Sequence, residues 1–137
     1  MSAKSIQFEL VSPERKLVDA PMNHVVIPGT EGYLGVGQGH ASYVVSLGHG
    51  TVSLYEKSLQ DKNPKKIFIA GGFADISAER CTVLAEQAVS LEDLDAKDLA
   101  ATLKTLQKDL KATNKDAEKI LLQNKITIIE SQIEAIS

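Results

Sequence analysis

Residues 24–36 read HVVIPGTEGYLGV, and this stretch determines the kind of fold to expect. Residues 24–27 are rich in β-branched side chains and stop at Pro28-Gly29, and a turn at 29–32 precedes a second short run at 33–36. β-Branched runs that end at Pro and Gly are typical of strands, and no helix of about ten residues fits between turn signals this close. The stretch therefore predicts two short strands joined by a tight turn.

The same pattern continues on both sides of this stretch. Residues 6–10 and 51–55 alternate apolar and polar side chains, which gives a strand one buried face and one wet face. Turns are expected at Gly48-His49-Gly50 and at Gly71-Gly72. The expected strands are residues 6–10, 15–19, 24–27, 33–36, 43–47, 51–55, 66–70, 73–77 and 81–86. Strands this short and this regularly spaced favour an antiparallel β-sandwich, or flattened barrel.

The C-terminal half has a different composition. Residues 74–137 contain no Gly, Pro or aromatic residue, and residues 91–137 hold 7 Lys and 9 Asp or Glu. Apolar residues recur here at i, i+4, i+7 and i+11, which is the stripe of an amphipathic helix. The first stripe is Leu99, Leu103, Leu106 and Leu110; the second is Leu122, Ile126, Ile129, Ile133 and Ile136, widened by Leu121 and Ile128.

The two helices are expected to form an antiparallel hairpin. Only residues 112–114 separate the stripes, so the connection is short. Asp95 is expected to cap the first helix and Asn114 the second. The predicted fold is therefore all-β plus α: an N-terminal β-sandwich at residues 1–89, followed by a C-terminal two-helix hairpin at residues 90–137.

Composition excludes several classes of function. The chain has 137 residues and a net charge of −3, so it lacks the positive charge that nucleic acid or an anionic membrane attracts. Its single cysteine, Cys81, argues against a disulfide-stapled secreted fold. The sequence begins Met-Ser-Ala-Lys with no apolar stretch behind it, and its apolar runs are short. We therefore expect neither a signal peptide nor direct insertion into a membrane.

Motifs for bond chemistry are weak or incomplete. GVGQGH at 35–40 is glycine-dense, but a dinucleotide fingerprint needs a glycine at His40 and a helix after it. The three histidines, His24, His40 and His49, lack metal-ligand spacing. Cys81 opens a strand of apolar residues and is expected in the core. We therefore expect no catalytic residue, no cofactor and no metal, and the residues alone indicate an interaction protein.

Several stretches, in order, resemble the epsilon subunit family of F-type ATP synthases. They are FELVSPERKLVDAP at 8–21, HVVIPGTEGYLGVGQGH at 24–40, KKIFIAGGFADIS at 65–77 and CTVLAEQA at 81–88. That family combines an N-terminal β-sandwich with a C-terminal helical hairpin, in agreement with the expectation from the residues. The resemblance implies a non-catalytic central-stalk rotor subunit that couples proton-driven rotation of the c-ring to ATP synthesis.

The resemblance also implies partners and a location. The sandwich would bind the gamma subunit and rest on the c-ring. The hairpin, when extended, would meet the alpha and beta subunits and could inhibit ATP hydrolysis. The protein would lie peripherally on the cytoplasmic side of the bacterial inner membrane.

By the family pattern, two loops would face the c-ring. Their residues are Glu31, Gly32, Tyr33, Gly39, His40 and Ala41. The chain departs from the pattern at Gln38 and Ser42, which replace common prolines, and at Tyr33, which replaces an acid. The basic face of the hairpin, which could meet an acidic surface of the catalytic subunits, is Lys104, Lys108, Lys111, Lys115 and Lys119. Relatives that bind ATP carry an arginine where this chain has Asp98, so we expect no ATP site.

Two other classes of function remain open. A small β-sandwich enzyme would need convergent titratable groups, and the sequence shows no such cluster. A stand-alone β-sandwich ligand-binding module would use exposed aromatic side chains for stacking. This chain has only three Phe, three Tyr and no Trp, and such a module would leave the helical tail unexplained.

Overall fold

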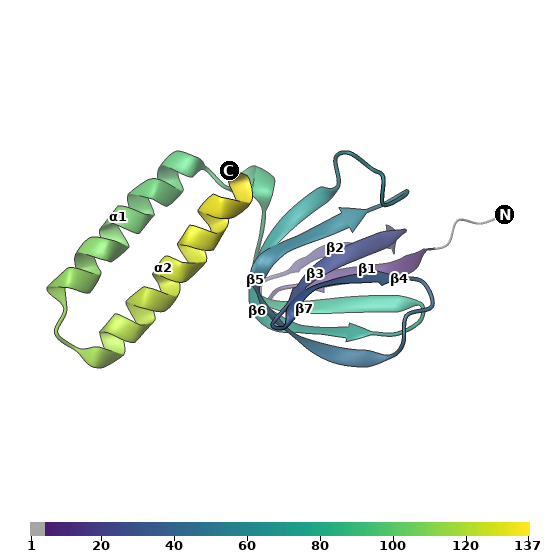
Figure 1. The fold of residues 1–137 in the computed structure, drawn as a ribbon, viewed down its shortest axis with the longest axis horizontal. Helices are drawn as coiled ribbons and strands as arrows, with labels where there is room; N and C mark the ends of the chain where they lie inside the picture. Colours follow the sequence, from purple (N-terminus) through teal and green to yellow (C-terminus); the bar gives the residue numbers. More distant parts are fainter. Residues whose placement is uncertain (1–4) are drawn as a thin grey trace. The chain divides into compact units, whose positions relative to one another are not determined.

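The computed structural model describes residues 5–137, which form strands followed by helices (Figure 1). The strands are β1 (Ile6–Val11), β2 (Lys16–Met22), β3 (His24–Gly29), β4 (Gly32–Gly37), β5 (Tyr43–Tyr55), β6 (Lys65–Ile76) and β7 (Arg80–Ser90). The helical elements are the 3-10 turn η1 (Leu91–Asp93), α1 (Ala96–Ala112) and α2 (Asp116–Ile136). The chain divides into two compact units, residues 1–89 and residues 90–137.

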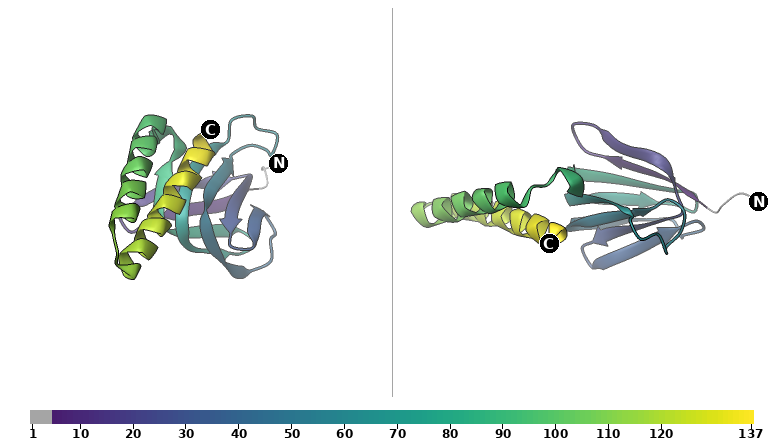
Figure 2. Two further views of the ribbon diagram at one scale, coloured as in Figure 1. Left: turned by 60° about the vertical axis from the view of Figure 1, so that its left-hand side comes forward. Right: turned by 90° about the horizontal axis from the view of Figure 1, so that it is seen from above.

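All the strands belong to one sheet, in the order β2-β1-β7-β6-β5-β3-β4. Figure 2 shows this sheet curling over so that its strands enclose a shared interior. The predicted β-sandwich is therefore confirmed, as a single sheet folded on itself. One pair departs from the antiparallel pattern: β1 and β7 run parallel, with Phe8 opposite Cys81 and Leu10 opposite Val83. Parallel neighbours need a long crossover, and here the strands β2 to β6 supply it.

Two of the expected turns are wrong. Residues 43–47 and 51–55 belong to the single strand β5, and residues 66–70 and 73–76 belong to β6. The pairing of β5 with β6 keeps one register across both sites, with Leu47 opposite Gly72. Glycine inside a strand can mark a bend or a close approach as well as a turn, so its presence alone could not separate these outcomes.

The glycines mark the place where β5 and β6 reverse the face that they turn to the core. The core residues are Ile67 and Ile69, then Ala74 and Ile76, in β6, and Leu47, then Val52 and Leu54, in β5. Side chains alternate between the faces of a strand, so a change from odd to even positions reverses the inward face. Gly71 and Gly72 have φ angles of 76° and 124°, and this left-handed pair interrupts the pleat.

Gly72 also lies against β7 more closely than a side chain permits. A Cβ atom on Gly72 would be 2.0 Å from the carbonyl oxygen of Leu84 and 2.9 Å from Cα of Ala85. Both neighbours are backbone atoms of the adjacent strand, so they cannot rotate away. Gly72 is therefore required by its conformation and by the space available.

The core of the sandwich is largely aliphatic, and two phenylalanines, Phe8 and Phe68, are also completely buried. Completely buried side chains include Phe8, Leu10, Val25, Ile27, Val36, Val52, Ile69 and Val83. Cys81 is also completely buried, as expected for a small core residue. Removing each large side chain of this set from water contributes about 1.5–3 kcal/mol, so burial dominates the stability of this unit.

The helices α1 and α2 lie side by side, joined by residues 113–115 (Figure 2). The two-helix hairpin is therefore confirmed. Asp95 caps α1 as expected, since its carboxylate accepts a hydrogen bond of 2.8 Å from the amide of Lys97. Asn114 does not cap α2. That helix begins at Asp116, so Asn114 lies one position too early, and the hydroxyl of Thr113 accepts the Lys115 amide at 3.3 Å instead.

The apolar stripes of the two helices are shielded from solvent, but only in part. Leu99 is buried, and Leu103, Leu106, Leu110, Leu122, Ile126, Ile129 and Ile133 are half-buried. Leu121, expected to widen the second stripe, is 60% exposed, as is Ile120. That expectation is wrong because one residue along a helix turns the side chain by about 100°, away from the stripe of Leu122.

The close approach at Gly72 predicts a specific sensitivity. Gly72→Ala is expected to destabilise the sandwich by about 3 kcal/mol or more, because it combines a backbone clash with a strained φ. Gly48→Ala is the matched control: Gly48 lies at the same bend, has no positive φ, and has no atom within 4 Å of the place that a Cβ would take. Urea unfolding of both variants measures the difference, and equal losses would contradict the proposed role of Gly72.

Candidate partner-binding surfaces

The first expected interface group lies in the turn between β3 and β4. Glu31 is exposed, and Gly32 has a φ of 129°, a conformation that favours glycine. The amide of Thr30 donates a 3.0 Å hydrogen bond to the carbonyl of Ser46, which ties the turn to β5. No atom lies within 4 Å of where a Cβ of Gly32 would be, so the backbone of this turn is open to a partner.

Tyr33 is 62% exposed, yet its hydroxyl group is held in place. The hydroxyl accepts a 3.1 Å hydrogen bond from the amide of Thr51. A Cβ on Gly50 would lie 2.6 Å from that hydroxyl oxygen and 2.8 Å from Cβ of Pro28, so the Tyr33 side chain reaches from β4 across β3 to β5. The β3–β5 register shifts between residues 26 and 29, and Tyr33 supplies an acceptor where that ladder is interrupted. Tyr33 therefore straps the turn to the sheet.

The second expected group lies in the loop after β4. Gly39 has a φ of 84°, and its amide donates a 2.7 Å hydrogen bond to the carbonyl of Ala78. The ring of His40 packs against Tyr43, with ring centroids 5.3 Å apart. Gly39 and Ala41 are exposed. The loop is thus anchored to the β6–β7 turn and still offers backbone to a partner.

These two groups do not form one cluster. Gly32 lies opposite Gly29 at one end of the β3–β4 ladder, and Gly37 lies opposite His24 at the other end. A strand of this length spans about 17 Å. Because β4 is the edge strand of the sheet, both groups flank one exposed edge. A single partner would have to run along β4 to meet both.

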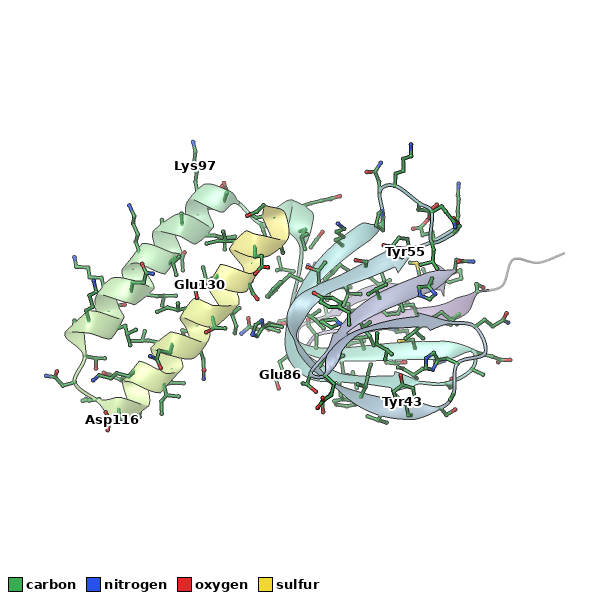
Figure 3. The ribbon with its side chains drawn as sticks, viewed as in Figure 1. Tyr43, Tyr55, Glu86, Lys97, Asp116 and Glu130 are labelled. Atoms are coloured by element: carbon green, nitrogen blue, oxygen red, sulfur yellow. The ribbon has the colours of Figure 1, made fainter. Side chains whose placement is uncertain are left out.

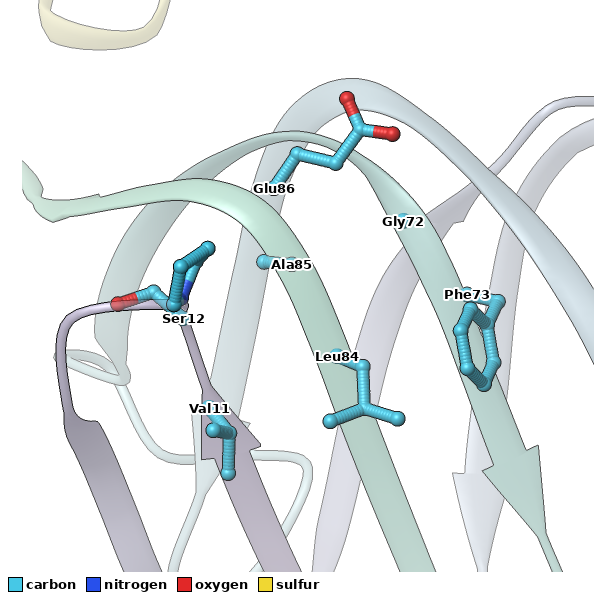
Figure 4. Close-up of a pocket in the computed structure, with 8 residues that line it drawn as sticks. Val11, Ser12, Gly72, Phe73, Leu84, Ala85 and Glu86 are labelled. Carbon is cyan, nitrogen blue, oxygen red and sulfur yellow. The ribbon is translucent and has the colours of Figure 1, made fainter.

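A third surface, an apolar patch on the outside of the sheet, is not predicted by the sequence. Phe73 is 44% exposed and Leu84 is 38% exposed. Val11 lies opposite Leu84 in the β1–β7 ladder. With Pro13, these side chains line an open pocket of about 350 Å³, in which Phe73 and Leu84 lie on neighbouring strands with Glu86 at the rim (Figure 4). This apolar patch joins three strands, β1, β6 and β7.

The sequence does contain a signal for the apolar patch: two large apolar residues occupy outward positions in the alternation of their strands. Phe73 precedes Ala74 by one position and is therefore out of phase with the inward residues Ala74 and Ile76. Leu84 lies between the inward residues Val83 and Ala85. A large apolar residue at an outward position of a strand marks a surface that a partner can cover. The expected turn at Gly71-Gly72 hides this signal for Phe73. If a strand starts at residue 73, no earlier residues of that strand show which positions face inward.

Carboxylates surround the apolar patch. Glu86 lines the pocket, and Glu14 accepts a 3.2 Å hydrogen bond from the hydroxyl of Ser12, which also lines it. Asp75 follows Phe73 by two positions and so shares its face. Within residues 5–137, Glu86, Glu14 and Asp75 make no ion pair. The rim of the patch is therefore acidic and unneutralised.

The basic side chains Lys16 on β2 and Arg80 on β7 pair with other carboxylates. Lys16 lies 3.2 Å from Asp19 and 3.3 Å from Glu9, and Arg80 also pairs with Glu9. The hydrogen bond from Lys16 to Asp19, and then the one to Glu9, raises the pKa of Lys16. A hydrogen bond from Gln7 is the largest cause that lowers the pKa of Asp19. Exposed ion pairs contribute little to stability, so the main effect of this network is to orient the side chains of Lys16, Arg80 and their carboxylate partners.

The five lysines expected on the hairpin are all exposed. Lys104, Lys108 and Lys111 lie on α1 at helical spacing, Lys115 precedes α2, and Lys119 lies in its first turns. Figure 3 shows charged side chains such as Lys97, Asp116 and Glu130 extending from both helices. Acidic residues are interspersed, so the hairpin carries a mixed surface.

Groups suited to bond chemistry are scarce. No cluster of three or more His, Cys, Asp or Glu that could hold a metal occurs among the described residues. Burial raises the pKa of Cys81 to about 12, so its thiol is a core group and a poor nucleophile. No helix in the described part of the chain is long and apolar enough to cross a membrane.

The sandwich displays an apolar patch and is followed by a helical hairpin. This arrangement is typical of a subunit that binds other proteins. The family described as ATP synthase, Delta/Epsilon chain, beta-sandwich domain matches residues 5–91. The ATP synthase epsilon chain of Rhodospirillum centenum is 38% identical over 138 residues, which cover 98% of this chain and 94% of that one. The chain therefore belongs to the ATP synthase delta/epsilon family, and it is an accessory stalk subunit rather than a catalytic one.

Other relatives agree with this assignment. The ATP synthase epsilon chain of Brucella anthropi is 43% identical over 108 residues, covering 79% of this chain and 78% of that one. A chain of the Euglena gracilis mitochondrial ATP synthase superposes with a TM-score of 0.83 at 23% identity, covering 100% of this chain and 84% of that chain. A chain of the Tetrahymena thermophila ATP synthase central stalk and c-ring has a TM-score of 0.62 at 12% identity, with both chains fully covered. At these identities the two structures establish the fold.

The Tyr33 strap predicts a small, local effect. Tyr33→Phe is expected to cost about 0.5–1.5 kcal/mol, because it leaves the Thr51 amide without its acceptor. The amide of Thr51 should then exchange faster with solvent. Tyr43→Phe is the control, since its hydroxyl makes no hydrogen bond among residues 5–137. Unchanged exchange at Thr51 in Tyr33→Phe would show that the hydroxyl does not hold the turn.

Proposed function

We propose that this chain is a rotor component of the central stalk of F-type ATP synthase, coupling proton-driven rotation of the c-ring to ATP synthesis. The similarity to epsilon chains over 98% of the chain carries the proposal. Such a part performs no bond chemistry. It needs a stiff body with separate surfaces for two partners, so that torque passes from one to the other.

The apolar patch is the surface that we propose for the gamma subunit. Its exposed side chains, Phe73 and Leu84, can supply the buried apolar centre that stable interfaces need. The unpaired carboxylates of Glu86, Glu14 and Asp75 would form its polar rim. The matching surface of gamma should therefore present apolar side chains bordered by Lys or Arg.

The exposed edge formed by β4 is the surface that we propose for the c-ring. The turn at Glu31-Gly32 and the loop at Gly39-His40-Ala41 lie at its two ends. Gly32 and Gly39 have no atom within 4 Å of a Cβ position, so backbone groups there can approach the polar loops of a ring closely. In the sheet order β3 and β5 separate β4 from β6, so the exposed edge and the apolar patch belong to different strands.

The unit at residues 90–137 is proposed as a regulatory hairpin. When extended it would contact the alpha and beta subunits and damp ATP hydrolysis, with the exposed lysines meeting an acidic surface. The partial burial of its stripes supports this role, because a hairpin with one buried leucine gains from additional contacts. The assembled protein would lie on the cytoplasmic side of the bacterial inner membrane, held there peripherally by its partners.

The gamma surface is tested by substitutions in the apolar patch. Leu84→Asp and Phe73→Asp should each weaken binding of gamma by about tenfold or more, because a charge at an apolar interface centre is desolvated without a partner. Leu59→Asp is the control, since Leu59 is 54% exposed on the loop between β5 and β6. Co-purification of tagged chain with gamma and the catalytic subunits measures the effect. Equal recovery of gamma by all three variants would exclude the patch.

The regulatory hairpin is tested with a chain that ends at Val89. Complexes carrying this chain should assemble, and they should hydrolyse ATP faster than complexes with the full chain. If the lysines act electrostatically, added salt should narrow the difference, since screening is strong beyond about 10 Å at 0.1 M salt. Replacing the five lysines by Gln in the full chain is the matched variant. Equal hydrolysis by full and truncated chains at every salt concentration would contradict the regulatory role.

A further inference from the structure

Two side chains on the outer face of the β3–β4 pair lie over glycines of other strands: Tyr33 extends from β4 toward β5, and His24 extends from β3 over β4. Tyr33 reaches from β4 to Gly50 of β5, as described above. His24 reaches from β3 over β4: a Cβ on Gly35 would lie 2.7 Å from Nε2 of its ring, and a Cβ on Gly37 would lie 3.1 Å from Nδ1. The imidazole of His24 therefore fills the space that two side chains of the edge strand would otherwise take.

The two straps secure different ends of the edge strand. His24 pairs with Gly37, the last residue of β4, directly before the loop at 38–42. Tyr33 follows Gly32, the first residue of β4, beside the turn. Loss of one strap would therefore free one end of β4 and leave the other attached.

Only one of the two straps uses a group that changes charge near neutral pH. Histidine is the side chain whose ordinary titration falls between about pH 5 and 8. His24 is half-buried, and this burial lowers its pKa; the neighbouring His40 lowers it further. Its register partners are Gly37 on β4 and Tyr55 on β5, and the titratable neighbour that acts on it is His40 from the loop.

We propose that His24 is an acid-sensitive strap, whose protonation releases the C-terminal end of β4 and the loop at 38–42 while the Tyr33 end stays fixed. The proposal concerns the chain by itself and holds whichever partner binds this edge.

The sign follows from proton linkage. A base whose pKa is lower in the folded state binds more protons when the chain unfolds. The packed position of the His24 ring over Gly35 and Gly37 therefore loses stability as the pH falls below the ordinary histidine pKa of about 6.5. Near neutral pH the imidazole of His24 is uncharged and lies over Gly35 and Gly37. In acid it becomes a partly desolvated cation beside His40, and opening the strap exposes it to water.

Amide hydrogen exchange on the full chain tests the proposal at both ends. The amide of Gly39, which donates to Ala78, reports on the loop, and the amide of Thr51, which donates to Tyr33, reports on the turn. Protection factors, corrected for the intrinsic pH dependence of exchange, are compared at about pH 7.5 and about pH 5.5. Protection of Gly39 should fall several-fold in acid, while protection of Thr51 stays constant.

Substitutions assign the response to one side chain. His24→Phe keeps a ring over the glycines, and His24→Gln keeps a polar group, but neither titrates; both should abolish the acid response of Gly39. His40→Gln should reduce it, because the substitution removes the neighbour that helps to lower the pKa of His24. His49→Gln, on β5, is the control and should leave it unchanged.

Three results would overturn the proposal. An acid response that persists in both His24 variants assigns it to another group. Equal loss of protection at Gly39 and Thr51 indicates general acid loosening. Constant protection of Gly39 in the wild-type chain, with the His24 ring resonances titrating over the same range, shows that protonation occurs without release. The wild-type comparison decides even if the His24 variants fold poorly.

Discussion

The contact between β6 and β7 at Gly72 is the constraint on which the sandwich depends. A single sheet can enclose a core only if its strands bend, and β6 bends where two glycines adopt positive φ in succession. The bend brings the Gly72 Cα against the backbone of Leu84 and Ala85, at a distance that excludes any Cβ. Hydrophobic burial supplies the driving force for folding, but this backbone contact determines whether β6 can bend and still lie against its neighbour β7.

The same bend produces the apolar patch. Had β6 kept the phase set by Ile67 and Ile69, residue 73 would face the core; the reversal turns Phe73 outward instead. Leu84 lies beside it on β7, and the pocket between them includes Gly72 itself. The bend thus has two effects: its inner side closes the core, and its outer side leaves the apolar side chains of Phe73 and Leu84 exposed.

Local patterns predicted the elements well, because alternation and helical stripes depend on neighbours in sequence. The strand 6–10 and the leucine stripe of α1 needed nothing else. The failures within the sheet involve information from other strands. The pair Gly71-Gly72 is compatible with a turn or with a bend, and only the position of β7 distinguishes the two. The hydrogen bond between Tyr33 and Thr51 depends on the register of β3 and β5. The two groups expected to face the c-ring lie at opposite ends of β4, and this placement depends on the β3–β4 pairing.

The parallel pairing of β1 with β7 has a consequence for how the chain folds. The first and last strands of the sandwich are neighbours, so the sheet cannot be completed until Leu84 has been synthesised. Contacts this distant in sequence form slowly, because the closing loop must be ordered before they are gained. The helices that follow depend on hydrogen bonds within their own turns, and elements of this kind form in about a microsecond. Formation of the hairpin therefore does not limit the rate of folding. The edge of β1 that pairs with β7 stays unpaired until β7 has been synthesised.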